Sequence, residues 1–201
     1  MCRFKSGIIF KTRCVVAPGE NDSHSDLLRE LNIDDTYANA SRVFVRAELV
    51  PANNEWWTDP DGWEYVVDQD VTPDWYDTDP GKYEEEFRQA VKAWWGKHVL
   101  VDKKIDELRS GYYKLKRCEV KKLLNDVKVY LNSSTVGKMC GSSTVGKMCG
   151  SSTVGEMWGS STVGKMYNSS TARDFKSFPN VKVHVPKGGR FELVEHEEER
   201  R

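Results

Sequence analysis

The sequence has no apolar run that approaches the ~20 residues a membrane-spanning helix needs. Its five cysteines include no Cys-x-x-Cys pair, so we expect neither a disulfide framework nor a zinc knuckle. Hydrophobic residues make up only 38% of the chain, and the deficit lies mostly in Ser/Gly/Thr-rich repeats. The short apolar stretch in MCRFKSGIIFKTR is followed at once by Lys11. It therefore predicts a strand rather than a signal peptide, and a cytoplasmic protein without membrane contact.

Charge is balanced overall but unevenly spread. The formal net charge is −1. Residues 51–90 hold twelve Asp or Glu against two Lys or Arg, whereas residues 91–128 hold five against eleven. The near-neutral total thus conceals an acidic, Trp-rich segment followed by a basic one. This net charge does not favour nucleic acid as the partner.

The last third of the chain consists of nine-residue repeats. In register they read NSSTVGKMC (132–140), GSSTVGKMC (141–149), GSSTVGEMW (150–158), GSSTVGKMY (159–167) and the decayed NSSTARDFK (168–176). A period of nine is far from any multiple of 3.6, and Ser-Thr-Val favours an extended backbone. The repeats therefore predict a short parallel β-solenoid whose coils bury their apolar faces against one another.

The near-identity of the units assigns a role to each repeat position. Val136, Met139 and their equivalents are expected to point inward, with Ser134 and its equivalents as small, hydrogen-bonded fillers. Two units are expected to form one coil, because nine residues enclose too little interior. The strand-like segments 125–131 and 180–185 are expected to cap the array. Tight corners are expected at the glycines: Gly137, Gly141, Gly146, Gly150, Gly155, Gly159 and Gly164.

The residues before the repeats alternate strand and helix patterns. Ser25 is a candidate N-cap for a helix over Asp26–Leu31. Asp79-Pro80 predicts the start of a helix over Gly81–His98 that carries Trp94 and Trp95. Strands are predicted over Ser6–Phe10, Arg13–Ala17, Arg42–Val50, Trp63–Val67, Val99–Val101 and Tyr112–Leu115.

The fold class predicted from these patterns is α+β. Residues 1–124 are expected to form a mixed, mainly antiparallel sheet covered by the Trp-bearing helix. Residues 125–185 are expected to form the β-solenoid with its capping strands, and residues 186–201 a charged tail.

Two residues are candidates for catalysis. Removal of Met1 would leave Cys2 with its thiol and a free α-amine on one residue, the arrangement of an N-terminal nucleophile that carries its own base. His24, in NDSHSD, is a candidate to assist it. The alternatives are that Cys2 is merely a small residue and that the polar cluster around His24 caps a helix. The other histidines have no partners at ligand spacing, so no metal site and no cofactor are predicted.

The acidic segment interleaves aromatic side chains with carboxylates. Such a surface could bind a basic partner, and the alternative is a solvated loop whose tryptophans are anchored in the core. The binding residues predicted in this segment are Trp57, Trp63, Asp68, Asp70 and Trp75.

The repeat positions that vary between units are candidates for contact. Cys140, Cys149, Trp158 and Tyr167 occupy one such position. Because aromatic side chains are favoured as interface anchors, Trp158 and Tyr167 are predicted to bind a partner.

Several motifs resemble known proteins. The Met-Cys start resembles that of class II glutamine amidotransferases and SOS-response-associated peptidases, although Arg3 stands where both families have Gly. The combination of that start, NDSHSDLL, VFVRAELVP, VVDQDVTPDWYD and the SSTV repeats resembles a family of gut-bacterial and phage proteins. This second resemblance implies a two-part protein and carries over no catalytic residue. It also implies, by analogy with phage accessory proteins, an inhibitor of host defence such as an anti-CRISPR protein.

Three functions follow from the sequence. The first is a macromolecular binding protein, with a protein as its partner and nucleic acid as the alternative. The second is an N-terminal-nucleophile amidohydrolase or amidotransferase that uses Cys2. The third is a structural protein that self-associates through its solenoid.

Overall fold

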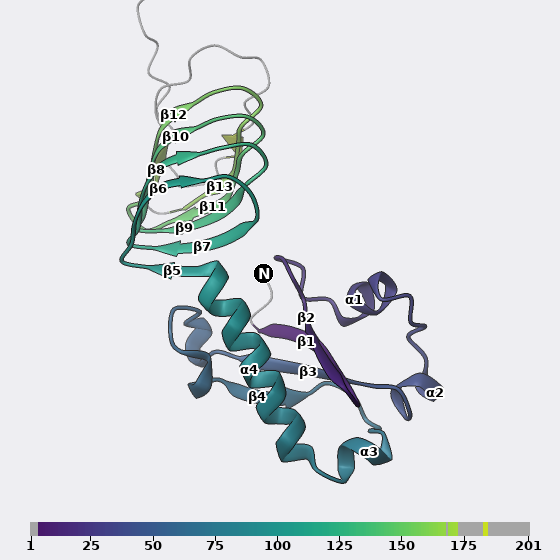
Figure 1. Ribbon diagram of the computed structural model, residues 1–201. Coiled ribbons are helices and arrows are strands. Elements are labelled where there is room, and N and C mark those ends of the chain that lie inside the picture. Colours follow the sequence, from purple (N-terminus) through teal and green to yellow (C-terminus); the bar gives the residue numbers. More distant parts are fainter. Residues whose placement is uncertain (1–3, 168, 173–182, 185–201) are drawn as a thin grey trace, which may run out of the picture. The chain divides into compact units, whose positions relative to one another are not determined.

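The protein is described here by a computed structural model that places residues 4–167, 169–172 and, for the backbone, 183–184 (Figure 1). The chain divides into two compact units, Met1–Lys97 and His98–Arg201. The first contains a small antiparallel sheet with helices and the second a parallel β-solenoid, as the predicted α+β class requires. No helix in the described ranges is long and apolar enough to cross a membrane.

The first unit is built on a four-stranded antiparallel sheet with the order β2-β1-β3-β4. The strands predicted over Ser6–Phe10 and Arg13–Ala17 are present and pair antiparallel, and the alternation in RVFVRAELV correctly predicts the third strand. Ile8 in β1 lies opposite Arg46 in β3, and Glu48 in β3 lies opposite Val66 in β4. The strands are β1 (Lys5–Phe10), β2 (Arg13–Val16), β3 (Phe44–Val50) and β4 (Glu64–Val67).

Helices lie on both faces of this sheet. Ile8 belongs to a core cluster with Leu27 and Leu28 of α1 (His24–Glu30) and with Ala40 of α2 (Tyr37–Ala40). On the other face, α4 (Pro80–His98) packs so closely that a Cβ at Gly7 would lie 2.6 Å from the Phe87 ring. The Asp79 carboxylate accepts a hydrogen bond from the Lys82 amide at 3.2 Å, which confirms the predicted start of this helix. The connections contain α3 (Asp74–Asp77) and 3₁₀ turns at Ala52–Asn54 and Pro60–Gly62.

Helix α1 begins two residues earlier than predicted. Its N-cap is Ser23, whose hydroxyl accepts a hydrogen bond from the Asp26 amide at 3.2 Å. Ser25 lies inside the helix and donates to Asp35 instead, at 2.7 Å. The assignment of Ser25 as the cap was wrong because serine is a good N-cap residue at either position and the sequence does not distinguish the backbone angles of Ser23 and Ser25. The shift makes His24 the first residue of the helix.

The second unit is a solenoid of two parallel sheets around one apolar core (Figure 1). We call the sheet β15-β13-β11-β9-β7-β5 the odd sheet and the sheet β14-β12-β10-β8-β6 the even sheet. The odd strands are β5 (Val99–Val101), β7 (Tyr112–Lys116), β9 (Lys128–Asn132), β11 (Thr144–Cys149), β13 (Thr162–Met166) and β15 (Val183–His184). The even strands are β6 (Lys104–Leu108), β8 (Glu119–Leu123), β10 (Thr135–Met139), β12 (Thr153–Met157) and β14 (Thr171–Ala172).

The strand register confirms that two repeats form one coil. Val136 pairs with Val154 and Met139 with Met157, so equivalent residues two units apart lie in neighbouring coils. The predicted inward Val and Met side chains are at most 1% exposed. The serines of the predicted filler position are also buried.

The solenoid starts much earlier than the repeats. Val99–Val101 and Tyr112–Leu115, predicted as strands of the first domain, belong to β5 and β7 of the odd sheet. Segment 125–131, predicted as a cap, contains most of β9, which lies between β7 and β11. The second predicted cap, 180–185, lies outside the described residues apart from the backbone of β15.

The glycines divide into two kinds. Gly141, Gly150 and Gly159 have φ near +65°, at +68°, +64° and +67°, and form the predicted corners. Glycines at the other repeat position lie within strands instead, and at Gly137, Gly155 and Gly164 close stacking on a backbone carbonyl leaves no room for a side chain. A Cβ on Gly155, for example, would be 2.5 Å from the carbonyl oxygen of Gly137.

Candidate functional site

His24 is held in a defined orientation at the start of α1. Its ring is only 8% exposed, and Nε2 lies 3.2 Å from the carbonyl oxygen of Ala47 in β3. A carbonyl oxygen can only accept, so the nitrogen that faces it carries the proton. In the neutral ring, Nδ1 therefore presents its lone pair on the opposite side.

Two carboxylates face Nδ1. Oδ2 of Asp68 lies 3.2 Å from it and Oε1 of Glu48 lies 3.9 Å from it. Glu48 projects from β3 and is 12% exposed, whereas Asp68 follows β4 and is 58% exposed. The antiparallel pairing of these two strands brings the acidic residues together below the helix, although they are far apart in the sequence.

Burial shifts the proton equilibria of this cluster. It lowers the pKa of His24 below its usual value, because the charged imidazolium loses solvation. It raises the pKa of Glu48 to about 7, and the negative charges of Asp68 and Asp22 add to that shift. The arrangement therefore combines a neutral imidazole with two carboxylates that, among the described residues, form no ion pair with Lys or Arg, which suits either proton transfer or cation binding.

The cluster forms part of the wall of an open pocket of about 440 Å³. Arg46 also lines this pocket and forms an ion pair with Asp35. Asp22, a buried residue of the lining, is paired with Lys5 at 2.8 Å. Phe4, Ser23 and Ser25 also line the pocket. Cys2, the predicted nucleophile, lies outside the described residues, and its role stays a prediction.

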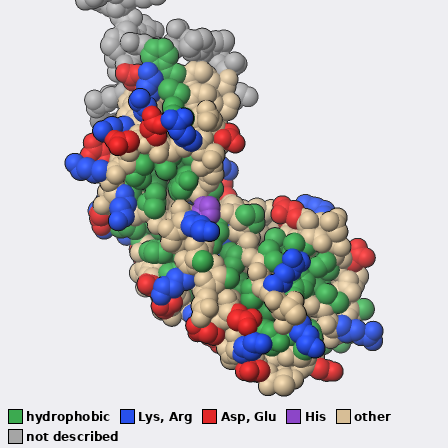
Figure 2. Space-filling model, viewed as in Figure 1, with side chains coloured by type: hydrophobic (Ala, Val, Ile, Leu, Met, Phe, Trp, Pro, Cys, Tyr) green, Lys and Arg blue, Asp and Glu red, His purple; other side chains and the backbone are tan. Residues whose placement is uncertain are grey.

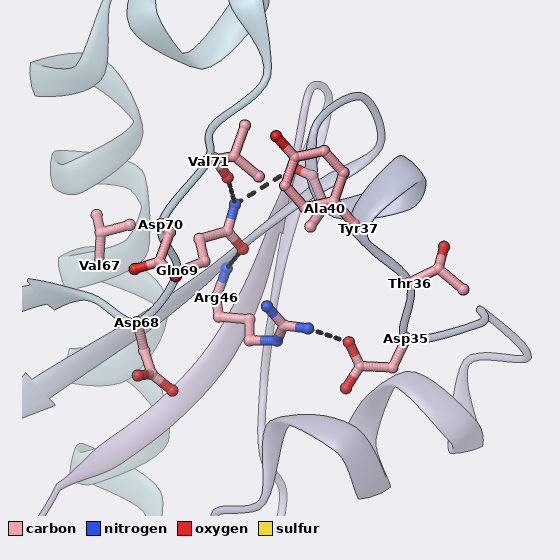
Figure 3. A pocket seen from close by; sticks show the side chains of 10 residues that line it. All are labelled: Asp35, Thr36, Tyr37, Ala40, Arg46, Val67, Asp68, Gln69, Asp70 and Val71. Atoms are coloured by element: carbon pink, nitrogen blue, oxygen red, sulfur yellow. Dashed lines mark hydrogen bonds and ion pairs between the residues drawn. The ribbon is translucent and has the colours of Figure 1, made fainter.

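An adjoining pocket of about 480 Å³ shares Asp35, Arg46 and Asp68 with the first (Figure 3). The side-chain amide of Gln69 donates to the Val71 carbonyl at 2.6 Å and accepts from the Arg46 amide at 2.9 Å. These bonds fix the chain that follows β4. In Figure 3 the carboxylates of Asp68 and Asp70 point away from the Gln69 amide.

The three tryptophans predicted as binding residues in the acidic segment are buried or half-buried in the first unit. Trp63 is 2% exposed and packs edge to face against Trp56, with ring centroids 5.3 Å apart. Trp75 is half-buried and donates to the Arg42 carbonyl at 2.9 Å. Trp57 is half-buried as well. Trp63 therefore fits the alternative prediction, in which the tryptophans of this segment are anchored in the core. Of the predicted binding residues in the segment, Asp68 is the one that joins the His24 cluster.

Trp158 and Tyr167 are both predicted to bind a partner. They lie next to different sheets of the solenoid. Trp158 follows β12 of the even sheet, donates to Glu156 at 2.8 Å and lies under the Lys138 ammonium at 4.2 Å. Tyr167 follows β13 of the odd sheet, where the Lys147 ammonium lies 4.8 Å from its ring. The two residues thus follow strands of different sheets, and their role in binding stays a prediction.

The two sheets also differ in charge. The even strands carry four lysines and four acidic residues, and each lysine is paired with one of the acids in the neighbouring strand: Lys104–Glu119, Lys121–Asp106, Lys122–Glu107 and Lys138–Glu156. Acidic and basic side chains lie next to one another on the solenoid in Figure 2. The odd strands contain five lysines and, within their described ranges, no Asp or Glu: Lys114, Lys116, Lys128, Lys147 and Lys165.

Sequence reasoning missed Glu48 and the difference between the sheets. Glu48 occupies a polar position of an alternating strand, a pattern that indicates a solvent-facing residue. The sheet topology therefore defines the chain as an α+β protein with a parallel β-solenoid. Comparison with protein-family models, curated proteins and solved structures finds no match.

Proposed function

We propose that this chain is a macromolecular binding protein whose solenoid holds an acidic protein segment against the odd sheet. The observation that supports this function is the difference in charge between the two sheets. The even strands carry equal numbers of lysines and acidic residues, whereas the described odd strands carry lysines and no Asp or Glu, and four of these five lysines are at least partly exposed. Complementary charge of this kind steers a partner towards a surface and fixes its register.

The stacking of the odd strands strengthens the argument. Lys147 lies directly opposite Lys165, and like charges at paired positions destabilise a sheet. An acidic segment laid along the stack would relieve this repulsion. Tyr130 and Tyr167, on either side of the Lys147 ammonium at 5.4 Å and 4.8 Å, supply aromatic area for the same contact.

The rest of the chain favours a protein partner over nucleic acid. Residues 51–90 carry twelve acidic and two basic residues. A long polyanion would be repelled by such a segment, whereas a short acidic peptide needs to meet only the solenoid. The predicted role as an inhibitor of a host defence complex is a narrower form of this proposal.

The experiment is a capture from cell lysate on the tagged full-length chain, with and without nuclease, read by mass spectrometry. It is run in parallel on Lys147→Gln/Lys165→Gln and on the matched even-sheet variant Lys121→Gln/Lys122→Gln. We expect an acidic protein that is retained after nuclease and lost from the first variant alone. For the purified pair, affinity should fall about tenfold, since each exposed charge pair is worth up to about 1 kcal/mol.

The aromatic residues provide a second comparison. Tyr167→Ala is expected to weaken capture, whereas Trp158→Ala on the even side is expected to leave it unchanged. Equal capture by all variants, or a partner that disappears on nuclease treatment, would contradict the proposal.

A further inference from the structure

We infer that His24, Glu48 and Asp68 form a binding site for a divalent transition-metal ion such as Mn²⁺ or Zn²⁺. The site lies wholly within the first unit and goes beyond the proposed function of the solenoid. The three side chains each offer one ligand atom, and these atoms all lie within 4.8 Å of one another.

The distances fit a shared ion. Two ligands that each bind one ion at about 2.0–2.2 Å stand about 2.9–3.6 Å apart at tetrahedral or octahedral angles. The separations from Nδ1 are 3.2 Å to Asp68 and 3.9 Å to Glu48. Small side-chain rotations would bring all three atoms to bonding distance.

The orientation of His24 distinguishes this site from a chance cluster of acids. Metal-bound histidines commonly donate the other ring N–H to a carbonyl or carboxylate, which fixes the tautomer and aims the lone pair. Nε2 of His24 faces the Ala47 carbonyl at 3.2 Å, in a ring that is 92% shielded from solvent. The lone pair of Nδ1 is thereby directed at the two carboxylates before any ion binds.

Local charge also favours a cation. Arg46, which lines the pocket, is paired with Asp35, and Lys5 is paired with the pocket residue Asp22. Among the described residues, no Lys or Arg forms an ion pair with Glu48 or Asp68. A bound dication would neutralise these two carboxylates and accept the lone pair of His24.

The ligand set indicates the class of ion. One imidazole nitrogen with two carboxylates suits Mn²⁺, Fe²⁺ or Zn²⁺, whereas Mg²⁺ and Ca²⁺ prefer all-oxygen surroundings. The 58% exposure of Asp68 and the open pocket of about 440 Å³ leave further coordination positions accessible to water or to an oxygen ligand.

The test is isothermal titration calorimetry of the full-length chain with MnCl₂, because Mn²⁺ has little affinity for the five thiols. Asp68→Asn removes one ligand at an exposed position and should leave the fold intact. We expect one Mn²⁺ per chain in the wild type, and affinity at least ~10-fold lower in Asp68→Asn and in Glu48→Gln. The matched control is Asp70→Asn, an exposed residue that lies outside the cluster and should bind as the wild type does.

Mg²⁺ is titrated in parallel and should bind much more weakly than Mn²⁺. The electron paramagnetic resonance spectrum of bound Mn²⁺ reports nitrogen ligation and should change in His24→Gln, whose circular dichroism spectrum checks folding. Absence of Mn²⁺ binding in the wild type, or equal binding by Asp68→Asn and Asp70→Asn, would overturn the inference.

Discussion

Lys5 and Asp22 form an ion pair inside the first unit, with Nζ 2.8 Å from Oδ1 and side chains that are 0% and 5% exposed. The Lys5 ammonium also donates to the Gly19 carbonyl at 3.1 Å and lies 4.0 Å from the Trp94 ring centroid. The backbone carbonyl of Asp22 accepts from the Ser6 hydroxyl at 2.7 Å. These bonds tie β1 to the turn before α1 and thereby position His24.

Removal of one partner of this pair should destabilise the first unit strongly. Asp22→Asn would leave the Lys5 charge buried without its counter-ion, and we expect the free energy of unfolding to fall by about 3–5 kcal/mol. Tryptophan fluorescence during urea denaturation reports this unit, because six of the seven tryptophans lie in residues 1–97.

An exposed pair in the same unit provides the control. Arg29 and Asp26 are also in contact, at 2.7 Å, but the Arg29 side chain is 77% exposed. Arg29→Gln should leave the urea midpoint unchanged, since solvent already screens that pair. A midpoint for Asp22→Asn that matches that of Arg29→Gln would show that the buried pair contributes nothing.

A methyl group at Gly155 should disrupt the solenoid. Its Cβ would lie 2.5 Å from the backbone carbonyl oxygen of Gly137 in the neighbouring coil, and a backbone atom cannot move aside without shifting the strand. Gly155→Ala is expected to lower stability by about 1–3 kcal/mol, the usual range for overpacking. Thermal unfolding followed by circular dichroism measures the change.

Gly146 is the matched control at the same repeat position. Its Cβ would meet the end of the flexible Lys128 side chain at 3.4 Å, because the register of β9 against β11 shifts beside it. Gly146→Ala should therefore cost clearly less than Gly155→Ala. Equal melting temperatures for the two variants would mean that the close stacking at Gly155 does not limit the coil.

The repeated coils could be predicted from the sequence because their spacing is constant, whereas the first coils could not. Inward residues two repeats apart, such as Val136 and Val154, are separated by 18 residues. The equivalent positions Ile105, Val120 and Val136 are 15 and 16 residues apart, without the Ser-Ser-Thr-Val-Gly pattern. Variable corner lengths conceal the period, so these strands were assigned to the first domain.

The candidate metal cluster likewise could not be predicted from the sequence. His24 and Asp68 were each singled out for their residue type and context, but for different roles. Their proximity depends on the packing of α1 against a sheet in which Glu48 lies opposite Val66, two residues before Asp68. Tertiary pairing of this kind leaves no local pattern, and the absence of ligand spacing led to the prediction of no metal site.

The buried serines of the repeats should differ in their response to removal of the hydroxyl. Ser152 donates to the Cys149 carbonyl at 2.6 Å and accepts from the Ser134 amide at 3.3 Å. Ser143 is equally buried, but its hydroxyl has no hydrogen-bond partner among the described residues. Ser152→Ala should lose about 1 kcal/mol, and Ser143→Ala should be neutral or slightly stabilising. Melting temperatures of the two variants provide the comparison, and a larger loss at Ser143 would contradict it.

The thiol of Cys14 should react slowly with alkylating reagents at neutral pH. Burial raises its pKa to about 11, and the negative charge of Glu86 adds to the shift. Because the thiolate is the nucleophile, only about one Cys14 in a thousand is reactive at pH 8, and the alkylation rate should rise about tenfold per pH unit until the pKa is approached. Peptide mass spectrometry after short exposure to iodoacetamide measures this rate, and Glu86→Gln should increase it.

The slow reaction of Cys14 makes it an internal reference for the predicted nucleophile Cys2. An N-terminal cysteine whose own α-amine assists it should be alkylated first by limiting iodoacetamide at pH 7, well ahead of Cys14. Mass spectrometry of the intact chain shows in the same experiment whether Met1 has been removed. The variant Cys2→Ala should abolish the fast phase and leave the melting temperature nearly unchanged, because a nucleophile contributes its chemistry rather than core packing. Labelling of Cys2 no faster than Cys14, or a large fall in melting temperature for Cys2→Ala, would assign Cys2 a structural role instead.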